Sequence, residues 1–310
     1  MDKHIPVMLN EVIENLNIKE NGIYVDCTLG RAGHSSEILK RIPKGYLYGF
    51  DQDKRAIDES NELLSSIAHN FTLIHTNFIN VKGKLNELGV NSVDGILMDL
   101  GVSSPQFDDG ERGFSYRYDA RLDMRMNQAN DLDAHYIVNN YSLNELTRIF
   151  REYGEEKYAY NIAKGIVKSR ESKAVDTTFE LVNIIKNVLP KKELIKKGHP
   201  AKQVFQALRI ETNHELDYLT KVLSDVLSLL NVGGRLAIIT FHSLEDRIVK
   251  KAFKNVSEIE GSRHAPIVLP KEENKPNYRL VNRQVIVASE EELVINPRAQ
   301  SAKLRIIERI

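Results

Sequence analysis

A short apolar run that ends on an acid constrains this chain more than any other feature. Residues 95–98 read Gly-Ile-Leu-Met, which suits a buried parallel strand, and Asp99 ends the run. Ligands of open α/β sheets bind beyond the carboxyl ends of the strands, where hydroxyls and free carbonyls would form a polar site. An ordinary turn uses the same residue types, so this stretch alone leaves both interpretations open. The residues in question are Gly101, Ser103, Ser104 and Pro105.

The first predicted strand, residues 23–27, runs into a glycine loop at 28–34. A helix follows, with Ser35 or Ser36 as its expected N-cap. Glycine lets the backbone approach a ligand closely, and the first N–H groups of a helix are unpaired. The loop reads Asp-x-Thr-x-Gly-x-x-Gly, which is neither the dinucleotide fingerprint nor a phosphate loop. It therefore suits a nucleoside-bearing ligand that has no pyrophosphate.

Two more predicted strands also have informative ends. The strand that begins at Tyr46 reaches Asp51, which is placed to accept hydrogen bonds from ribose hydroxyls, whereas Asp53 fits better as a helix cap. The strand at 71–75 is followed by Phe78, which either stacks on an adenine or belongs to the core. Strands with polar carboxyl ends, separated by helices, predict a doubly wound α/β half-domain that binds a nucleoside-bearing cofactor.

Residues 108–200 differ in character from the chain on either side. Helical apolar spacing recurs from Leu132 to about Leu189, so we predict a helical insertion at 108–200 within an α/β domain formed by 1–107 and 201–310. Arginines interleaved with aromatic residues near its start either contact phosphates and stack bases, or form a salt-bridged loop. These residues are Arg112, Phe114, Tyr116, Arg117, Arg121 and Arg125. A lysine cluster lies at 191, 192, 196 and 197.

The second part of the α/β domain is predicted to begin with one long amphipathic helix at 204–230. A buried strand at 235–241 then leads to His242, which is a candidate catalytic group, although a lone histidine is more often structural. Residues 284–288 and 303–308 are expected to form the last two strands as an antiparallel pair. Arg298 and Lys303 lie in a locally basic stretch there and are further candidates for RNA contacts.

Composition narrows the class of protein. Lysines and arginines number 43, as do aspartates and glutamates, so a nucleic-acid partner would have to bind a local basic patch. The single cysteine, Cys27, excludes a disulfide framework. Neither a long apolar span nor a leader peptide is evident, so we expect a cytoplasmic protein without a membrane partner. Metal-ligand spacing is also lacking in the sequence, so no metal is expected.

Five motifs, all in one order, resemble a bacterial family, and the likeness extends from His4 to the tail at 301–305. The family is the S-adenosylmethionine-dependent methyltransferases of the RsmH or MraW type, which act on cytosine N4 in small-subunit (16S) ribosomal RNA. The resemblance implies a Rossmann-like, seven-stranded class I methyltransferase sheet with an inserted all-helical domain for substrate recognition. It also implies ribosomal RNA, within an assembled or assembling subunit, as the partner; a homodimer is one option for the oligomeric state. The motifs are Asp26–His34, Asp99–Gln106, Glu111–Ser115, Leu122–Met126 and Phe241–Arg247.

The resemblance also assigns cofactor residues, each at the position that matches a motif. Ala32 stands where the family often has glycine, and its methyl group narrows the room beside the cofactor. The residues implied to bind S-adenosylmethionine are Ala32, Gly33, His34, Asp51, Phe78, Asp99 and Gln106.

Attack by the cytosine amine needs in-line positioning and hydrogen-bond acceptors for the amine protons. DNA amino-methyltransferases use an Asp/Asn/Ser-Pro-Pro-aromatic loop for this purpose, and here the second proline and the aromatic residue are missing. The identity of the acceptor therefore stays open, and the catalytic candidates are Asp99, Ser103, Ser104, Pro105 and His242. Two other functions also remain open: a small-molecule methyltransferase with the insertion as a lid, and a non-catalytic RNA-binding assembly factor.

Overall fold

The computed structural model describes residues 5–102, 107, 109–258 and 275–310. The chain folds into two compact units, which we call unit 1 (residues 1–101 and 216–310) and unit 2 (102–215). The predicted helical insertion at 108–200 lies within unit 2. Four predicted site residues lie outside the described residues: Ser103, Ser104, Pro105 and Gln106.

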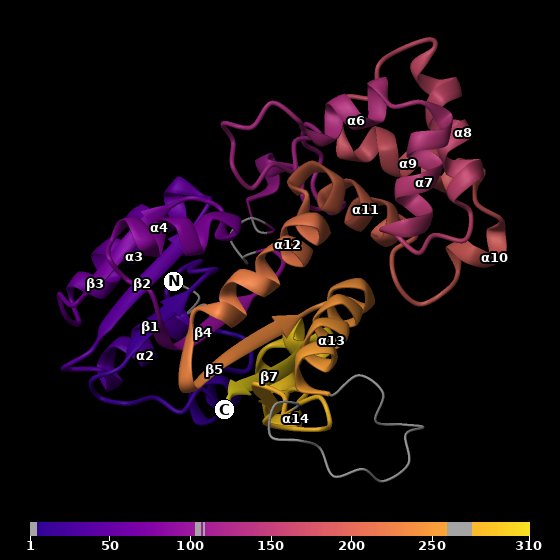
Figure 1. Cartoon of the computed structure of the whole chain (residues 1–310). Coiled ribbons are helices and arrows are strands. Elements are labelled where there is room, and N and C mark those ends of the chain that lie inside the picture. Colours follow the sequence, from indigo (N-terminus) through magenta and orange to yellow (C-terminus); the bar gives the residue numbers. More distant parts are fainter. Residues whose placement is uncertain (1–4, 103–106, 108, 259–274) are drawn as a thin grey trace, which may run out of the picture. The chain divides into compact units, whose positions relative to one another are not determined.

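Unit 1 contains a seven-stranded sheet in the order β3-β2-β1-β4-β5-β7-β6 (Figure 1). The first five strands are mutually parallel, and β7 runs antiparallel to both of its neighbours. This order, with its antiparallel β7, confirms the class I methyltransferase fold expected from the sequence. The strands are β1 (Ile23–Asp26), β2 (Tyr46–Asp51), β3 (Phe71–His75), β4 (Val93–Asp99), β5 (Leu230–Thr240), β6 (Tyr278–Leu280) and β7 (Lys303–Arg309).

The strand order reverses between β1 and β4, which lie side by side in the middle of the sheet. Asp26 on β1 pairs in register with Leu97 on β4, and with Gly49 on β2 on its other side. The carboxyl ends of β1, β2 and β4 therefore meet at one edge of the sheet. A crevice for ligands forms at such a switch point, because the connections leave the sheet in opposite directions there.

Helices cover both faces of this sheet, and each face has its own apolar cluster. Side chains of a strand alternate between faces, so Ile96 and Met98 join one cluster whereas Leu97 joins the other. Burial on both sides explains why the run at 95–98 is continuously apolar. The first face packs against α4 (Val81–Glu87), α12 (Glu215–Ser228) and α13 (Ser243–Ser257), and the second against α1 (Leu9–Asn15), α2 (Gly33–Arg41) and α3 (Lys54–Ser65). Shorter elements are η1 (Phe78–Asn80), α14 (Glu290–Ile295) and η4 (Pro297–Ser301).

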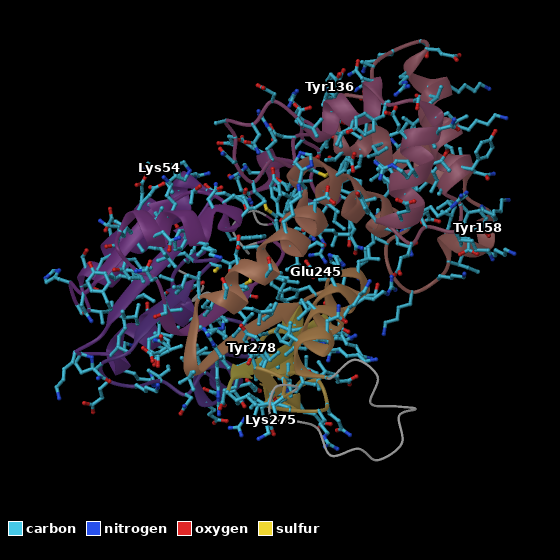
Figure 2. All side chains as sticks on the ribbon, viewed as in Figure 1. Lys54, Tyr136, Tyr158, Glu245, Lys275 and Tyr278 are labelled. Atoms are coloured by element: carbon cyan, nitrogen blue, oxygen red, sulfur yellow. The ribbon has the colours of Figure 1, made fainter. Side chains whose placement is uncertain are left out.

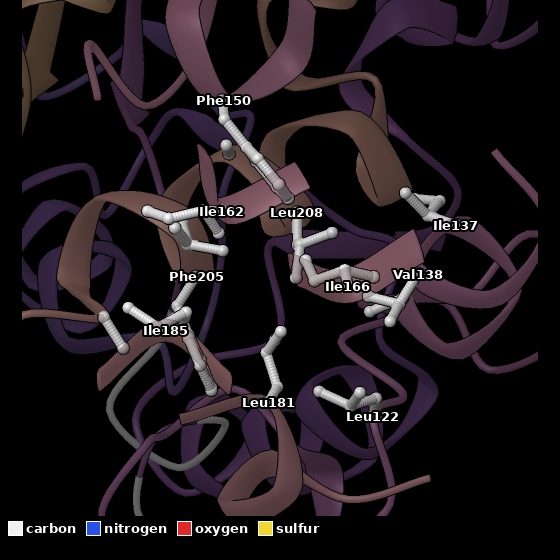
Figure 3. Packing of buried hydrophobic residues seen from close by; sticks show 14 of the residues in the cluster. Leu122, Ile137, Val138, Phe150, Ile162, Ile166, Leu181, Ile185, Phe205 and Leu208 are labelled. Carbon is white, nitrogen blue, oxygen red and sulfur yellow. The ribbon is translucent and has the colours of Figure 1, made fainter. Parts of the chain in front are cut away.

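Unit 2 is helical around a core of its own, part of which Figure 3 shows. Phe150, Ile162 and Leu208 come from three different helices and are fully buried there. Capping boxes begin two of the helices, with Ser142 and Thr177 as N-caps, because a glutamate follows each at the third helical position. The helices are η2 (Gly110–Arg112), α6 (Ala134–Asn140), α7 (Leu143–Glu152), α8 (Ala159–Arg170), α9 (Thr178–Val188), α10 (Lys191–Leu194) and α11 (Lys202–Asn213).

The single long helix predicted at 204–230 is wrong. The structure has two helices there, α11 and α12, because His214 between them adopts a left-handed conformation with φ 52°. A left-handed residue ends a helix by turning its N–H back to the last carbonyls, and the His214 N–H bonds to the Glu211 carbonyl. Apolar spacing continues across the break, which is why periodicity alone did not reveal it.

The prediction for the penultimate strand was also wrong. Residues 284–288 contribute one isolated bridge, between Ile286 and Leu304, and β6 lies earlier, at Tyr278–Leu280. Tyr278 explains this placement: its ring packs against the core, and its hydroxyl donates a 3.0 Å hydrogen bond to the Leu227 carbonyl. Among the described residues, no helix is both long and apolar enough to cross a membrane.

Candidate functional site

Asp26 ends β1 and is almost completely buried, with 2% of its surface exposed. One carboxylate oxygen accepts a 2.7 Å hydrogen bond from the Ser35 hydroxyl, and the other accepts one of 3.1 Å from the Thr28 N–H. Burial nevertheless raises the pKa of Asp26 to about 6, because it disfavours the charged form more than these donors favour it. Asp26 therefore holds together the loop and the first turn of α2.

The start of α2 differs from the prediction. The helix begins at Gly33 with Ala32 as its N-cap, and neither Ser35 nor Ser36 caps it. Both serines lie inside the helix, where the Ser35 hydroxyl bonds to Asp26 and the Ser36 hydroxyl to the Ala32 carbonyl. The buried Asp26 carboxylate competes for the Ser35 hydroxyl, so the serine forms a tertiary contact in place of a cap.

Ala32 and Gly33 show why this turn is rich in glycine. Ala32 is fully buried and left-handed, with φ 54°, a conformation that glycine adopts without strain. At Gly33, a Cβ atom would lie 2.3 Å from Cγ of Pro6. The absence of a side chain at Gly33 therefore makes room for Pro6 in the chain's own N-terminal segment. From the sequence, we had expected this room to be for a ligand.

Asp51, at the end of β2, binds the glycine loop. Its two oxygens accept hydrogen bonds of 2.8 Å each, from the N–H groups of Gly30 and Asp53. Asp53 caps α3, as predicted, by accepting from the Arg55 N–H. Burial raises the pKa of Asp51 to about 6, and the charges of Asp53 and Asp26 add to the shift. Each carboxylate oxygen has a further lone pair, so Asp51 can still accept a ribose hydroxyl.

Asp99, at the end of β4, has one carboxylate oxygen available to a ligand. Its backbone N–H donates a 2.6 Å hydrogen bond to the Thr28 hydroxyl, and Oδ2 lies 4.0 Å from Nδ1 of His34. Oδ1 is buried and has no hydrogen-bond partner among the described residues. Burial raises the pKa of Asp99 well above its ordinary value, and the charges of Asp26 and Glu245 raise it further. A buried acceptor without a donor is costly, so a ligand donor would stabilise it.

His34 is held in a fixed orientation beside Asp99. Its Nε2 lies 3.0 Å from the Val7 carbonyl oxygen, which can only accept, so Nε2 carries the proton. Phe78, the proposed adenine partner, is half-buried against the core beside β3. Both of its interpretations, stacking and core packing, are compatible with this position. The preceding residue, Asn77, donates a 2.8 Å hydrogen bond to the Gln52 side chain and so joins the loops after β2 and β3.

The structure thus brings together the polar ends of three strands, as we expected from their sequence. Hydrogen bonds from Gly30 to Asp51 and from Asp99 to Thr28 connect the loops after β1, β2 and β4. The contacts of Thr28 with Asp99 and of Ser35 with Asp26 were not predicted. Hydroxyl residues within reach of an aspartate at a strand end were the signal that could have identified them.

His242 lies at the N-cap of α13 (Figure 2 labels Glu245, its partner in a capping box). Nδ1 of His242 accepts from the Glu245 N–H at 3.5 Å, and Nε2 lies 3.2 Å from Glu245 Oε1. The other carboxylate oxygen, Oε2, accepts 2.8 Å and 3.3 Å hydrogen bonds from the N–H groups of Phe241 and His242. Nδ1 thus has a structural partner, whereas the buried Nε2 makes no hydrogen bond within the described residues. A catalytic role for His242 stays a prediction.

Two residues of the arginine-aromatic segment of unit 2 are buried. Arg112 and Phe114 are 5% and 4% exposed, and the Arg112 guanidinium donates to the carbonyls of Arg125 and Met126 at 2.8 and 3.1 Å. Side chains buried to this degree offer almost no surface to RNA, which argues against the RNA contacts predicted for Arg112 and Phe114. Arg125 makes a bidentate contact with Asp123.

The other candidate RNA contacts are more exposed. Arg121 pairs with Asp133 at 2.7 Å, and Lys303 lies 3.5 Å from Asp246, which also binds Arg305. Arg298 is exposed on η4. Tyr116 is half-buried, and Arg117 is exposed and forms no ion pair within the described residues.

Comparisons with known proteins agree with this architecture. The model of a family described as "MraW methylase family" matches residues 1–310. A protein of Clostridioides difficile, named "Ribosomal RNA small subunit methyltransferase H", is 51% identical over 309 residues, which cover 99% of each chain. Proteins of the same name from Exiguobacterium sibiricum and Lactobacillus delbrueckii are 51% and 50% identical, over 100% and 99% of this chain and 99% of each relative. The chain belongs to the MraW methylase family.

Proposed function

We propose that this protein transfers a methyl group from S-adenosylmethionine to the N4 amine of a cytidine in small-subunit ribosomal RNA. Family membership over the whole chain supports the reaction class, and the relatives' printed name supports the substrate. The observation that carries the site assignment is the buried, unpartnered Oδ1 of Asp99 at the switch point of the sheet. We place the reaction in the bacterial cytoplasm, where ribosomal subunits are assembled.

The residues at the sheet edge fit the proposed cofactor. Asp51 has lone pairs for ribose hydroxyls, Phe78 offers a half-exposed ring for an adenine, and Asp99 has an acceptor for an N–H donor. The turn at Ala32, Gly33 and His34 supplies the backbone beside them. When bound, S-adenosylmethionine supplies a methyl group on a sulfonium, which is already strongly electrophilic. A positive charge near these buried acids would favour their ionised forms.

The chain's own task is then to position and polarise the amine. The lone pair of cytosine N4 is delocalised into the ring, so acceptors for the amine protons favour a tetrahedral nitrogen and stabilise the charge that develops on attack. Asp99 is one candidate acceptor, and the residues after it, Ser103, Ser104 and Pro105, are the others proposed. A strong base is not needed before attack, since the methylated amine loses its proton readily. A stacked or paired cytosine would have to be flipped out first.

The test is methyl transfer from radiolabelled S-adenosylmethionine to small ribosomal subunits that lack the modification, followed by nucleoside analysis. We expect label in N4-methylcytidine, with loss of label in Asp99→Asn. Asp94→Asn is the matched control, because Asp94 lies at the opposite end of the same strand and bonds to the Ile23 N–H. Its activity should be unchanged.

Two outcomes would contradict the proposal. Label on another nucleoside would refute the substrate assignment. No transfer, despite demonstrated cofactor binding, would refute the reaction and favour a small-molecule methyltransferase or a non-catalytic RNA-binding factor.

A further inference from the structure

The segment from Lys191 to Lys202 in unit 2 carries a concentrated positive charge. It contains five lysines and one glutamate, Glu193, which pairs with Lys196 at 2.5 Å. In the part of unit 2 that the structure describes, the remaining lysines form no ion pair, and all of them are exposed: Lys191, Lys192, Lys197 and Lys202. Because the whole chain has no net charge, this local excess is the kind of patch that a polyanion would recognise.

His199, inside this segment, is oriented by two contacts. Its ring stacks on that of Tyr116 with centroids 4.1 Å apart and planes within 3°. Tyr116 is in turn braced edge-on by Phe205 at 5.7 Å. Nδ1 of His199 accepts a 3.3 Å hydrogen bond from the Ala201 N–H, so the proton of the neutral ring is on Nε2. The half-exposed ring thus presents an N–H donor that has no protein acceptor among the described residues.

Two further exposed cations belong to unit 2. Arg117 follows Tyr116 directly, and Lys186 lies in the last turn of α9; both are exposed and have no ion pair within the described residues. Burial lowers the pKa of His199, and the positive charges of Lys186 and Arg117 lower it further. Arg117 lies next to the residue on which His199 stacks, and the charge of Lys186 acts on the same ring. Three donors without acceptors among the described residues, one of them held by stacking, thus belong to one part of unit 2.

We propose that Arg117, Lys186 and His199 form a phosphate-binding site that holds the RNA backbone of the substrate on unit 2. This inference rests on the proposed function and adds a contact between unit 2 and the RNA substrate. Arginine can contact a phosphate with two parallel N–H donors, lysine adds a point charge, and the fixed His199 N–H adds a directed hydrogen bond. The neighbouring lysines extend the positive surface along the nucleic-acid backbone.

Steady-state methyl transfer to small subunits tests this site, with Arg117→Ala, Lys186→Ala and His199→Ala compared with the wild type. For each variant we expect KM for the subunit to rise about fivefold to tenfold, with kcat and S-adenosylmethionine affinity unchanged. The matched control is Lys164→Ala, which removes an exposed lysine of α8 that forms no ion pair within the described residues. Its KM should stay near that of the wild type.

Direct RNA binding provides a second measurement that does not depend on turnover. The slope of log affinity against log salt should decrease by roughly 0.7–0.9 for each phosphate that the variant no longer neutralises, in Arg117→Ala and Lys186→Ala but not in Lys164→Ala. An equal decrease in all three variants would show nonspecific attraction and overturn the site.

Binding of inorganic phosphate tests whether this surface is only a site for free anions and has no part in RNA binding. If phosphate shifts the His199 NMR signals but none of the variants changes KM or RNA affinity, the surface is a simple anion site and the inference is wrong. If the wild type binds RNA through this surface but transfers no methyl group to it, the proposed function fails while the site assignment stands.

Discussion

The Ser35 hydroxyl, in the first turn of α2, donates a 2.7 Å hydrogen bond to the buried carboxylate of Asp26 at the end of β1. This contact attaches the helix to the strand and encloses the glycine loop between them. The hydrogen bond lowers the pKa of Asp26 by less than burial raises it, so the pKa is still about 6. The folded protein therefore keeps a proton on Asp26 at a pH where the unfolded chain has lost it.

A pH-dependent stability follows from this shift. Between about pH 4 and pH 6 the folded state binds more protons at Asp26 than the unfolded state, so this residue's contribution to the free energy of unfolding falls as pH rises. Asp26→Asn removes that dependence. Relative to the wild type, the variant should gain about 3 kcal/mol across this window, as measured by denaturant unfolding at several pH values.

Ser35→Ala is the companion variant, and it should act in the opposite direction. Loss of the hydroxyl removes a donor that favours the ionised carboxylate, so the pKa of Asp26 should rise further. The fall in stability should then continue to a higher pH and be larger in total. A difference between Asp26→Asn and the wild type that does not change from pH 4 to 7 would contradict the prediction.

Ala32→Gly should stabilise the protein. The left-handed conformation costs an alanine about 1 kcal/mol or more, and glycine avoids this cost but loses more chain entropy on folding. We expect a net gain of roughly 0.5 kcal/mol in the free energy of unfolding. Ala252→Gly, within the right-handed turns of α13, is the control and should cost about 1 kcal/mol. If both variants were destabilised alike, strain at Ala32 would be disproved.

A catalytic role of the His242 imidazole can be tested with a substitution that keeps the helix cap and removes the ring. Asparagine is among the best N-cap residues, so His242→Asn should keep the free energy of unfolding within about 0.5 kcal/mol, whereas His242→Ala should lose about 1 kcal/mol. We expect His242→Asn to keep kcat within about twofold. A stable asparagine variant with normal cofactor affinity but a kcat at least a hundredfold lower would show that the imidazole is catalytic.

Arg112 and Arg117 lie in one segment but should give opposite phenotypes. Arg112→Met removes two hydrogen bonds from a buried guanidinium to backbone carbonyls, so it should destabilise the protein by about 2–3 kcal/mol. The RNA affinity of the folded fraction should not change. Arg117→Met should instead lower RNA affinity and leave the unfolding transition in place, because Arg117 is exposed. The reverse result would restore Arg112 as an RNA contact.

Much of unit 1 was predictable from local patterns in the sequence. The run at 95–98, the strand at 71–75 and the acids Asp26, Asp51 and Asp99 identified strands with polar ends, because burial on both faces requires continuous apolar residues. Parallel strands separated by helices then predicted which ends share an edge. The helix cap Asp53 was likewise predictable, because it depends on contacts within one turn.

Only the tertiary structure decided how residues distant in sequence are used. The same arginine-aromatic pattern contains Arg117, which is exposed, and Arg112, which is buried and donates to the carbonyls of Arg125 and Met126. Likewise, Ser35 bonds to a distant carboxylate and Gly33 makes room for Pro6. Sequence patterns determine hydrophobicity and local conformation, because those depend on neighbours along the chain. Burial and the choice of hydrogen-bond partner depend on which segments meet in space, and so they were settled only by the complete fold.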